Sequence, residues 1–495
     1  MSAESFVQAL REDLEDDATR LIFADWLEEH GDWRAALLRL EVRLRQWIPD
    51  LAERRALQKQ RRELLRAHLL DWLGPLSRWC RRWAVNAGLV NLVLSARHFV
   101  SSPFSQHAAT LFQHAWTGMV RLEEVSQYFS QVCRAPHLQV IPGLDLRGAW
   151  LIEDDLRRLL GTGLENLVAL DLSCNPLTDH ALESLLSWPR LSHLRRLGLR
   201  NTHLTQESLL QLAAAAPRLR IDLPGAGLQQ TSRLSHGSII NSLGMTFVQV
   251  PAGSFLIGSP PDEVGRYDDE GPQFEVTLTR PCWMSAFLVT QGQYRQVMGA
   301  NPSYFVEVEG GGPTHPVDSV TWEESAEFCR RLSQLDEERR AGRSYRLPTE
   351  AEWEHACRGG VCDEVFWFGN AASSWQANFD GTLPYGSALE GPNLNCTTPV
   401  GWYEANPFGL FDTHGNLWEW CQDWYEEFWY EQRENVDPQG PERSERKTLR
   451  GGSWFNNGGS CRAAYRFRVR PDERSNHFGF RVCLEMAEAS GGRSP

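Results

Sequence analysis

The sequence predicts a multidomain protein with an α-helical N-terminus, a repetitive α/β middle part and a large α+β C-terminal domain. Three observations lead to this prediction. Apolar residues recur at helical spacing over residues 1–85. A leucine pattern repeats every 26 or 27 residues between 86 and 230. After residue 240, capped helices and short strands precede long loops rich in Gly, Asn and Trp.

The overall composition narrows the classes of function. The 50 basic and 64 acidic residues give a net charge of −14, which disfavours a general nucleic-acid binder or a partner of anionic membranes. There is no apolar stretch of about 18 residues that could span a membrane. Residues 1–11 also lack the basic and apolar parts of a signal peptide. We therefore expect a cytoplasmic protein with no nucleic-acid or membrane partner.

The eleven cysteines show no metal-finger spacing. Cys357 and Cys362 are the only close pair, and no second pair matches them, so a zinc site is not expected. Most of the cysteines are interpreted as small buried apolar residues.

The N-terminal part, residues 1–85, has the pattern of packed helices. Asp16 and Asp17 precede an apolar run and could cap its helix. Residues 37–73 place apolar side chains on one face, as a helical hairpin does. The string Leu-Ile-Phe-Ala-Asp-Trp-Leu-Glu-Glu-His-Gly-Asp at 21–32 resembles a short repeat-companion domain that precedes leucine-rich repeats in some bacterial proteins.

The middle part, residues 86–230, contains the pattern L-x-x-L-x-L-x-x-N-x-L. It is met at Leu167, Leu170, Leu172, Asn175 and Leu177, and variants occur at 141–151, 194–204 and 221–228, with a possible first copy at 89–99. This period is the leucine-rich-repeat signature, in which short strands bury leucines and Asn binds turn backbone groups. Helices are expected over 178–188 and 205–216. Such a curved ribbon often binds protein, although it could also serve only as a scaffold.

Residues 231–240 are interpreted as a linker, 241–486 as one domain and 487–495 as a disordered tail. Strands are expected at 247–251, 274–278 and 287–290. Two helices should begin at capping boxes, because each pairs a threonine cap with a glutamate three residues later: Thr321 with Glu324, and Thr349 with Glu352.

The motifs of the C-terminal domain resemble those of the formylglycine-generating enzyme, or sulfatase-modifying factor, superfamily. They include Gly-Met-Thr-Phe-Val-Gln-Val-Pro-Ala-Gly-Ser-Phe at 244–255, Tyr-Arg-Leu-Pro-Thr-Glu-Ala-Glu-Trp-Glu at 345–354, Gly-Asn-Leu-Trp-Glu-Trp at 415–420, Arg-Gly-Gly-Ser-Trp at 450–454 and Gly-Phe-Arg-Val at 479–482. The resemblance implies a variant of the C-type lectin fold. Its members include copper-dependent oxidases that convert a substrate cysteine to formylglycine, non-haem iron enzymes and non-catalytic binding domains.

The oxidases carry two thiols five residues apart after Gly-Gly-Ser, and two thiolates suit the soft ion Cu(I). This chain has Asn456 and Cys461 at those positions, and an amide is a poor ligand for Cu(I). Cys483 could approach Cys461, which the sequence leaves open. Cys461, Ser453 and Trp418 are the candidate catalytic residues. The favoured interpretation of Cys461 is a buried or unreactive residue, and Ser453 and Trp418 are equally explained as structural. The iron branch pairs this domain with a His-x-x-x-His-x-Glu motif, which does not occur here.

The resemblance also implies calcium, which binds carboxylate, amide and carbonyl oxygens. Asp412, Asn416, Glu419 and the carbonyl of Leu417 fall at the first calcium site of the superfamily. Asn378 and the carbonyl of Phe379 match part of a second site, whose later Asp is missing. The alternative for these carboxylates is hydrogen bonding to loop amides.

The segment after Gly452 is also a candidate ligand surface, because Arg and Tyr are frequent binding hot spots. In related lectin-fold proteins this segment carries the diversified residues. The alternative is a solvated edge. The candidate ligand-binding residues, expected to be exposed, are Asn456, Asn457, Arg462, Tyr465, Phe467, Arg468, Asn476 and His477.

The leading interpretation is a protein- or peptide-binding module of the formylglycine-generating enzyme type, with the repeats adding contact area. The alternative is a copper-dependent oxidase that converts a substrate cysteine to formylglycine and so activates sulfatases.

Overall fold

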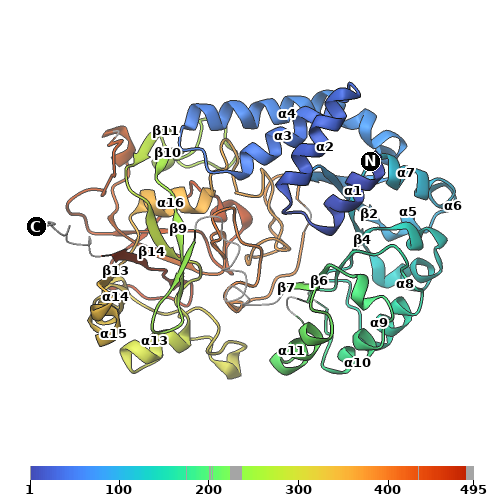
Figure 1. The fold of residues 1–495 in the computed structure, drawn as a ribbon. Helices are drawn as coiled ribbons and strands as arrows, with labels where there is room; N and C mark the ends of the chain where they lie inside the picture. Colours follow the sequence, from blue (N-terminus) through green and yellow to red (C-terminus); the bar gives the residue numbers. More distant parts are fainter. Residues whose placement is uncertain are drawn as a thin grey trace, which may run out of the picture. The chain divides into compact units, whose positions relative to one another are not determined.

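The computed structural model describes residues 2–486 except 174, 200, 201, 203, 223–236, 389 and 433. Most of the expected linker, the expected tail and the end of the 221–228 repeat lie outside the described residues. The end of the expected linker is wrong, because Ser238–Ile240 form a strand that pairs with Thr246–Val250. The chain divides into two compact units (Figure 1). Unit 1 comprises Met1–Gln46 and Arg55–Pro224, and unit 2 comprises Trp47–Arg54 and Gly225–Pro495.

The N-terminal part is helical up to residue 78, as the apolar spacing predicts. The end of the predicted helical part is wrong, because Cys80–Asn86 form a strand that pairs with Leu89–Ser95. The Asp16 side chain accepts a hydrogen bond from the Thr19 amide at 2.9 Å and caps the second helix. The apolar face of the first two helices is buried, including Phe6, Leu10 and Phe23. The helices are α1 (Ala3–Glu12), α2 (Asp17–Glu29), α3 (Arg34–Arg45) and α4 (Leu51–Leu73).

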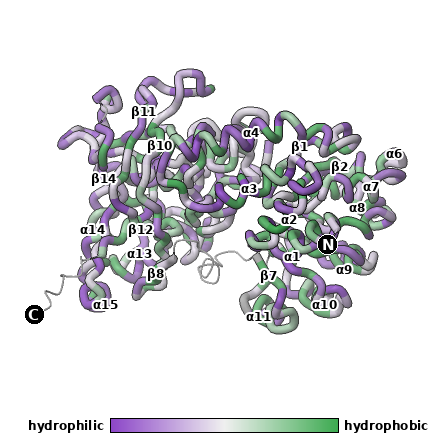
Figure 2. Tube along the Cα trace, turned by 45° about the horizontal axis from the view of Figure 1, so that its top comes forward, coloured by the Kyte–Doolittle hydropathy of each residue, from purple (hydrophilic) through white to green (hydrophobic). Residues whose placement is uncertain are grey.

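Hydrophilic and hydrophobic residues alternate along α4, which has 23 residues (Figure 2). Across the part of the chain that the structure describes, no helix combines the length and the apolar character needed to cross a bilayer.

Unit 1 contains a seven-stranded sheet in the order β1-β2-β3-β4-β5-β6-β7. β1 is antiparallel to β2 and the remaining pairs are parallel. The strands are β1 (Cys80–Asn86), β2 (Leu89–Ser95), β3 (Thr117–Glu123), β4 (Gly143–Asp145), β5 (Ala169–Asp171), β6 (Arg196–Gly198) and β7 (Arg220–Asp222). Helices follow the strands and lie along one side of the sheet (Figure 1): α5 (Ala96–Phe99), α6 (Ser102–Ser105), α7 (Ala108–His114), α8 (Val125–Arg134), α9 (Glu153–Leu160), α10 (His180–Leu186) and α11 (Gln206–Ala215).

The repeated leucines occupy equivalent, paired positions on neighbouring strands of this sheet. Leu144, Leu170 and Leu197 are direct partners on β4, β5 and β6, and all three are buried. The Asn175 amide donates to the carbonyls of Leu146 and Leu172, and its oxygen accepts from the Leu151 amide. The side chain therefore satisfies turn backbone groups, as the pattern predicts. The expected helices over 178–188 and 205–216 correspond to α10 and α11.

Unit 2 mixes helices with three small sheets. The sheet orders are β10-β11, β13-β18-β12-β9-β8 and β16-β15-β14-β17. The strands are β8 (Ser238–Ile240), β9 (Thr246–Val250), β10 (Gly253–Ile257), β11 (Phe274–Leu278), β12 (Cys282–Ser285), β13 (Arg343–Arg346), β14 (Trp418–Trp424), β15 (Lys447–Arg450), β16 (Phe467–Val469), β17 (Phe478–Gly479) and β18 (Cys483–Met486). The helices are α13 (Gln291–Met298), α14 (Trp322–Gln334), α15 (Asp336–Arg340) and α16 (Glu350–Arg358).

Most of the helices and strands predicted for unit 2 are present in the structure. Thr321 and Thr349 begin α14 and α16 with complete capping boxes, as predicted. The strands expected at 247–251 and 274–278 are β9 and β11. The strand expected at 287–290 is wrong. Thr290 makes one isolated bridge and then caps α13, so this segment turns into a helix instead of extending a ladder.

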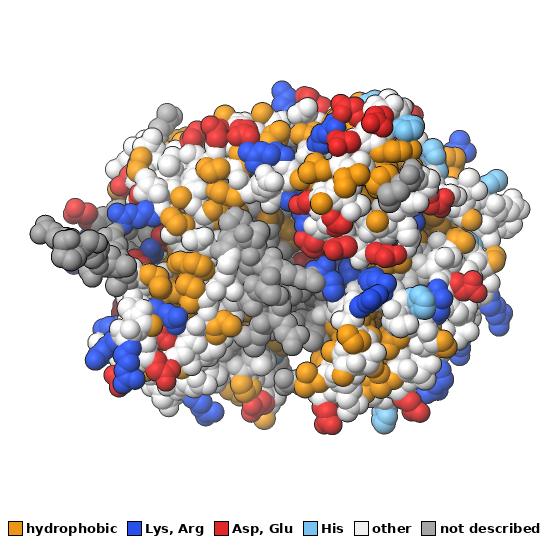
Figure 3. Space-filling model, in the orientation of Figure 1, with side chains coloured by type: hydrophobic (Ala, Val, Ile, Leu, Met, Phe, Trp, Pro, Cys, Tyr) orange, Lys and Arg blue, Asp and Glu red, His pale blue; other side chains and the backbone are white. Residues whose placement is uncertain are grey.

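Buried ion pairs connect α16 to the chain around β15. The guanidinium groups of Arg450 and Arg466 both bind Glu350, at 3.2 and 2.8 Å, and Arg450 also binds Glu354. All four side chains are buried. A buried charge is costly without a partner, so these pairs fix the position of the strand end that leads into Gly451. On the face drawn in Figure 3, acidic and basic side chains are intermixed with apolar ones.

Candidate functional site

The candidate site forms where β15 ends and the chain turns. Gly451 and Gly452 follow with φ of +95° and +79°, a backbone region that favours glycine. A Cβ on Gly452 would overlap the Sγ atom of Cys461 and also approach its Cα. The two glycines therefore let the backbone pass directly over Cys461, with Ser453 and Asn456 on the turn that follows.

The Asn456 amide is held at the centre of this turn. Its Oδ1 atom accepts a hydrogen bond from the Trp418 indole at 2.9 Å and another from the Ser453 hydroxyl at 2.6 Å. Three residues that the sequence singled out thus meet at one oxygen atom. Trp418 comes from β14, and Ser453 lies only three residues before Asn456, so the strand and the turn together position the amide.

Cys461 belongs to an apolar cluster with Phe366, Phe379 and Tyr385, and its side chain is buried. Burial raises the pKa of the Cys461 thiol far above its usual range, which keeps it protonated at neutral pH. The Sγ atom lies 3.7 Å from the Asn457 carbonyl. This environment suits an inert structural thiol more than a reactive one.

Two other thiols are relevant to whether a second sulfur ligand for copper lies near Cys461. Cys357 is near enough to add slightly to the raised pKa of Cys461, but it is also buried and its Sγ lies 3.5 Å from the Thr413 carbonyl. Cys483, which the sequence left as a possible neighbour of Cys461, has its Sγ 3.2 Å from that of Cys282 instead.

Aromatic rings extend from Asn456 on the Trp418 side. The Trp418 ring stacks on Phe467 at 4.8 Å and contacts Tyr465 at 5.5 Å, measured between centroids. Tyr465 in turn contacts Tyr267, which is 57% exposed. Tyr267 had no signal in the sequence, because it lies almost 200 residues before Tyr465 (465 − 267 = 198) in an irregular loop.

A second aromatic group begins at the residue before Asn456. Phe455 is 61% exposed and stacks on the His477 ring, with centroids 4.9 Å apart and planes within 12°. Trp454 contacts both rings and donates a hydrogen bond to the Asn476 carbonyl at 3.1 Å. Phe455 was missed from sequence, although its place between two candidate residues could have indicated it.

The expectation that the eight ligand-binding candidates are exposed holds only for Asn457. The half-buried candidates are Asn456, Tyr465, Phe467, Arg468, Asn476 and His477. Asn457 is exposed, and its side chain accepts a hydrogen bond from the Ser460 amide. Arg468 is half-buried and pairs with Asp269 at 3.2 Å. The expectation that Arg462 is exposed is wrong: its side chain is 0% exposed and bonds to Glu263 and Glu270 at 2.5 Å each. Arg462 therefore holds the loop at 263–270 against the site instead of facing a ligand.

The residues of the first implied calcium site have other partners. Both Glu419 oxygens accept from Arg481, at 2.6 and 2.8 Å, and the pair is fully buried. The Asn416 oxygen accepts from the Thr398 amide at 3.0 Å. Asp412 is also buried. Its Oδ2 accepts from the Gly401 amide at 2.7 Å, whereas its Oδ1 has no partner among the described residues.

The second implied calcium site touches the first. The Asn378 amide donates to the Asn416 oxygen at 3.3 Å, and the Asn378 carbonyl accepts from the Asn416 amide at 2.8 Å. Phe379 is buried beside Cys461, and the Leu417 side chain is buried as well. As a set these residues fit calcium poorly, because Arg481 already neutralises Glu419. The free oxygen of Asp412 is the one feature that suits an ion.

Comparison with known proteins agrees with the resemblance seen in the sequence. A family model described as "Sulfatase-modifying factor enzyme 1-like domain" matches residues 241–486. The formylglycine-generating enzyme of Thermomonospora curvata is 33% identical over 298 residues, which cover 48% of this chain and 93% of that enzyme. The enzyme of the same name from Streptomyces coelicolor is 37% identical over 189 residues. The matched residues cover 37% of this chain and 56% of the relative, so the chain spans little more than half of that relative's length. Among solved structures, PvdO from Pseudomonas aeruginosa is 28% identical with a TM-score of 0.43, covering 51% of this chain and 98% of PvdO.

Proposed function

The chain belongs to the sulfatase-modifying factor enzyme family through residues 241–486, and we propose that this domain binds a protein or peptide without oxidising it. The Asn456 amide carries the proposal. It stands where the oxidases of the family have a thiol, and its oxygen is engaged by Trp418 and Ser453. A hard amide oxygen and a buried, protonated Cys461 thiol do not make the two-thiolate pair that Cu(I) prefers.

The surface around Asn456 supports a binding role. Phe455 and Tyr267 are exposed, and both belong to contacting aromatic groups that reach the Asn456 turn. Aromatic side chains on a rigid frame lose little conformational entropy on binding and are frequent hot spots. The polar groups of Asn457 and Arg468 could add hydrogen bonds at the rim.

The alternative is a copper-dependent oxidase acting on cysteine-containing peptides. It is favoured by the names of the two relatives and by the presence of Ser453, Trp418 and Cys461 at matching positions. This alternative needs a second sulfur ligand that residue 456 does not supply.

Selection of peptides from a displayed random library on the full chain would test the proposal. We expect enriched peptides whose affinity falls about tenfold in Phe455→Ala, as truncation of an aromatic hot spot does. Met486→Ala is the matched control, because Met486 is also exposed and apolar but belongs to the five-stranded sheet. Failure to enrich any peptide, or equal losses in both variants, would contradict a binding surface at Asn456.

We further propose that unit 1 is a leucine-rich-repeat array preceded by a helical companion domain, and that the array adds contact area for the partner. The in-register leucines on β4, β5 and β6 and the hydrogen bonds of Asn175 support this assignment. Residence in the cytoplasm is also proposed. A calcium ion is not proposed as a structural cofactor, because Arg481 already neutralises Glu419, and only the Oδ1 atom of Asp412 among the implied side-chain ligands lacks a partner in the described part of the chain.

A further inference from the structure

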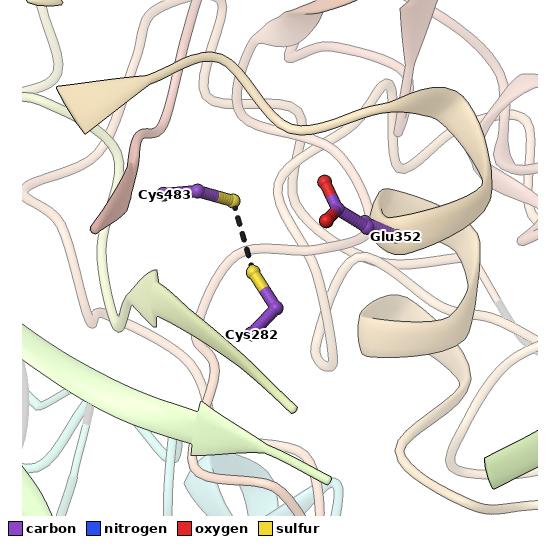
Figure 4. Close-up of side chains that lie close together, drawn as sticks. All are labelled: Cys282, Glu352 and Cys483. Carbon is purple, nitrogen blue, oxygen red and sulfur yellow. Dashed lines mark hydrogen bonds between the residues drawn. The ribbon is translucent and has the colours of Figure 1, made fainter. Parts of the chain in front are cut away.

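Two thiols outside the candidate site lie unusually close together. Cys282 is on β12 and Cys483 on β18, which are neighbouring antiparallel strands of the five-stranded sheet. Their Sγ atoms are 3.2 Å apart, and the Cys282 thiol donates a hydrogen bond to the Cys483 sulfur. Figure 4 shows the two sulfur atoms facing one another, with the Glu352 carboxylate of α16 beside them.

We propose that Cys282 and Cys483 are an oxidation site that closes to a disulfide when the protein meets hydrogen peroxide or an equivalent oxidant. A disulfide bond measures about 2.05 Å, so the sulfur atoms must approach by only about 1 Å. Cys282 is 9% exposed whereas Cys483 is 0% exposed. Because Cys282 is the more accessible thiol, it reacts with the oxidant first, and Cys483 then attacks it to form the disulfide.

The chemistry balances with one peroxide molecule. The hydrogen bond to Cys483 and burial raise the pKa of Cys282, so only the small ionised fraction of this thiol attacks a peroxide oxygen, and the reaction is slow. The O–O bond breaks, the leaving hydroxide takes up a proton, and a sulfenic acid and one water result. The Cys483 sulfur then attacks the sulfenic sulfur, the S–O bond breaks, and a second water leaves. Two thiols have lost two electrons and two protons, and the peroxide has been reduced.

Cys282, Cys483 and Glu352 could instead hold a metal ion, since the two sulfur atoms and one Glu352 oxygen lie within 4.8 Å of one another. The partners of Glu352 argue against this. Its two oxygens accept from Arg346 at 2.6 and 2.7 Å, and one also accepts from the Thr349 amide at 2.9 Å as part of the α16 cap. A metal would have to displace these bonds, whereas a disulfide leaves them and replaces two buried neutral thiols with a neutral group.

The bond would fasten a central element of the domain. β18 lies between β12 and β13, so the sheet separates if β18 is lost. Arg481, which neutralises Glu419 on the strand that carries Trp418, lies two residues before Cys483. Oxidation would therefore tie the C-terminal strand to the frame that carries the site.

The test is peptide mapping of the full chain by mass spectrometry after peroxide treatment and blocking of remaining thiols. We expect a cross-linked peptide pair containing Cys282 and Cys483, faster at higher pH because the hydrogen bond to Cys483 and burial raise the pKa of Cys282. Treated protein should also unfold at a higher temperature than untreated protein, and Cys282→Ser should lose that increase.

Cys329→Ser is the matched control, because Cys329 is another buried thiol whose pKa is raised by burial and by the nearby Cys483. Its replacement should leave the cross-link unchanged. Recovery of Cys282 and Cys483 as separately blocked thiols would overturn the proposal, as would a link between Cys329 and Cys483. Stoichiometric zinc in the purified chain that is lost in Cys282→Ser would show a metal site instead.

Discussion

Replacing Asp412 with Asn should stabilise the protein, although Asp412 is one of the implied calcium ligands. The side chain is buried, and its Oδ1 lacks a partner among the described residues. Burial raises the pKa of Asp412 to about 6, while the Gly401 amide and Arg481 act in the opposite direction. Asp412 has φ of +56°, which asparagine adopts as readily as aspartate does. The substitution thus removes a poorly matched charge without straining the turn.

The magnitude follows from the difference in pKa between the two states. The carboxyl ionises near pH 4 in the unfolded chain and near pH 6 in the folded one. The folded state therefore binds more protons in this interval, and the contribution of Asp412 to stability falls as pH rises from about 4 to about 6. Two pKa units correspond to roughly 3 kcal/mol. We expect Asp412→Asn to raise the free energy of unfolding by about 1–3 kcal/mol above pH 7 and by little near pH 4.

Urea denaturation followed by tryptophan fluorescence at several pH values, with EDTA present, measures this effect. Asp336→Asn is the control, because Asp336 is an exposed aspartate of the same unit. Adding calcium distinguishes an unmatched buried charge from a calcium ligand at residue 412. If Asp412 binds the ion, calcium should stabilise the wild type and not Asp412→Asn. A loss of stability in Asp412→Asn with EDTA would refute the argument that this charge is unmatched.

Three further predictions concern the frame around the site. Arg481→Met should cost about 3–5 kcal/mol in urea denaturation, because it leaves the Glu419 charge buried and unpaired, and adding Glu419→Gln should recover part of that loss. Gly415→Ala should lower the melting temperature by an amount equivalent to about 1–3 kcal/mol, since φ is +84° there and a Cβ would overlap the Asn378 carbonyl; unchanged melting would contradict the close approach. The urea midpoint of Asp412→Asn should fall as pH drops from about 6.5 towards 4. Burial lowers the pKa of His315, His355 and His414 to about 4, so these histidines take up protons on unfolding in this interval. A urea midpoint that does not change with pH would contradict their burial.

Features set by neighbouring residues were predictable from sequence. The capping boxes at Thr321 and Thr349 depend on side chains three residues apart, so the sequence alone determines where α14 and α16 begin. The same chemistry explains an error. Thr290 and Gln293 form another capping box, which went unrecognised, and the segment before it was assigned to a strand.

Contacts between distant residues were not predictable in this way. Arg462 was expected at the surface because arginine is usually exposed. Its partners Glu263 and Glu270 lie 199 and 192 residues away, and nothing near Arg462 indicates them. The contact between Cys483 and Cys282 spans 201 residues, and it is set by the pairing of β18 with β12. Trp418, Ser453 and Asn456 were each singled out by their places in family motifs, but the sequence did not predict that they meet at one oxygen atom.

A binding function without oxidation requires that the amide of residue 456 stands in place of a copper ligand. The most direct test incubates the full chain with Cu(I), oxygen and a cysteine-containing peptide carrying a sulfatase motif, and then measures copper retention and peptide mass. We predict that copper is lost to a competing chelator and that the peptide mass is unchanged. Conversion of the peptide cysteine to formylglycine, absent in Cys461→Ala, would contradict the account and establish the oxidase.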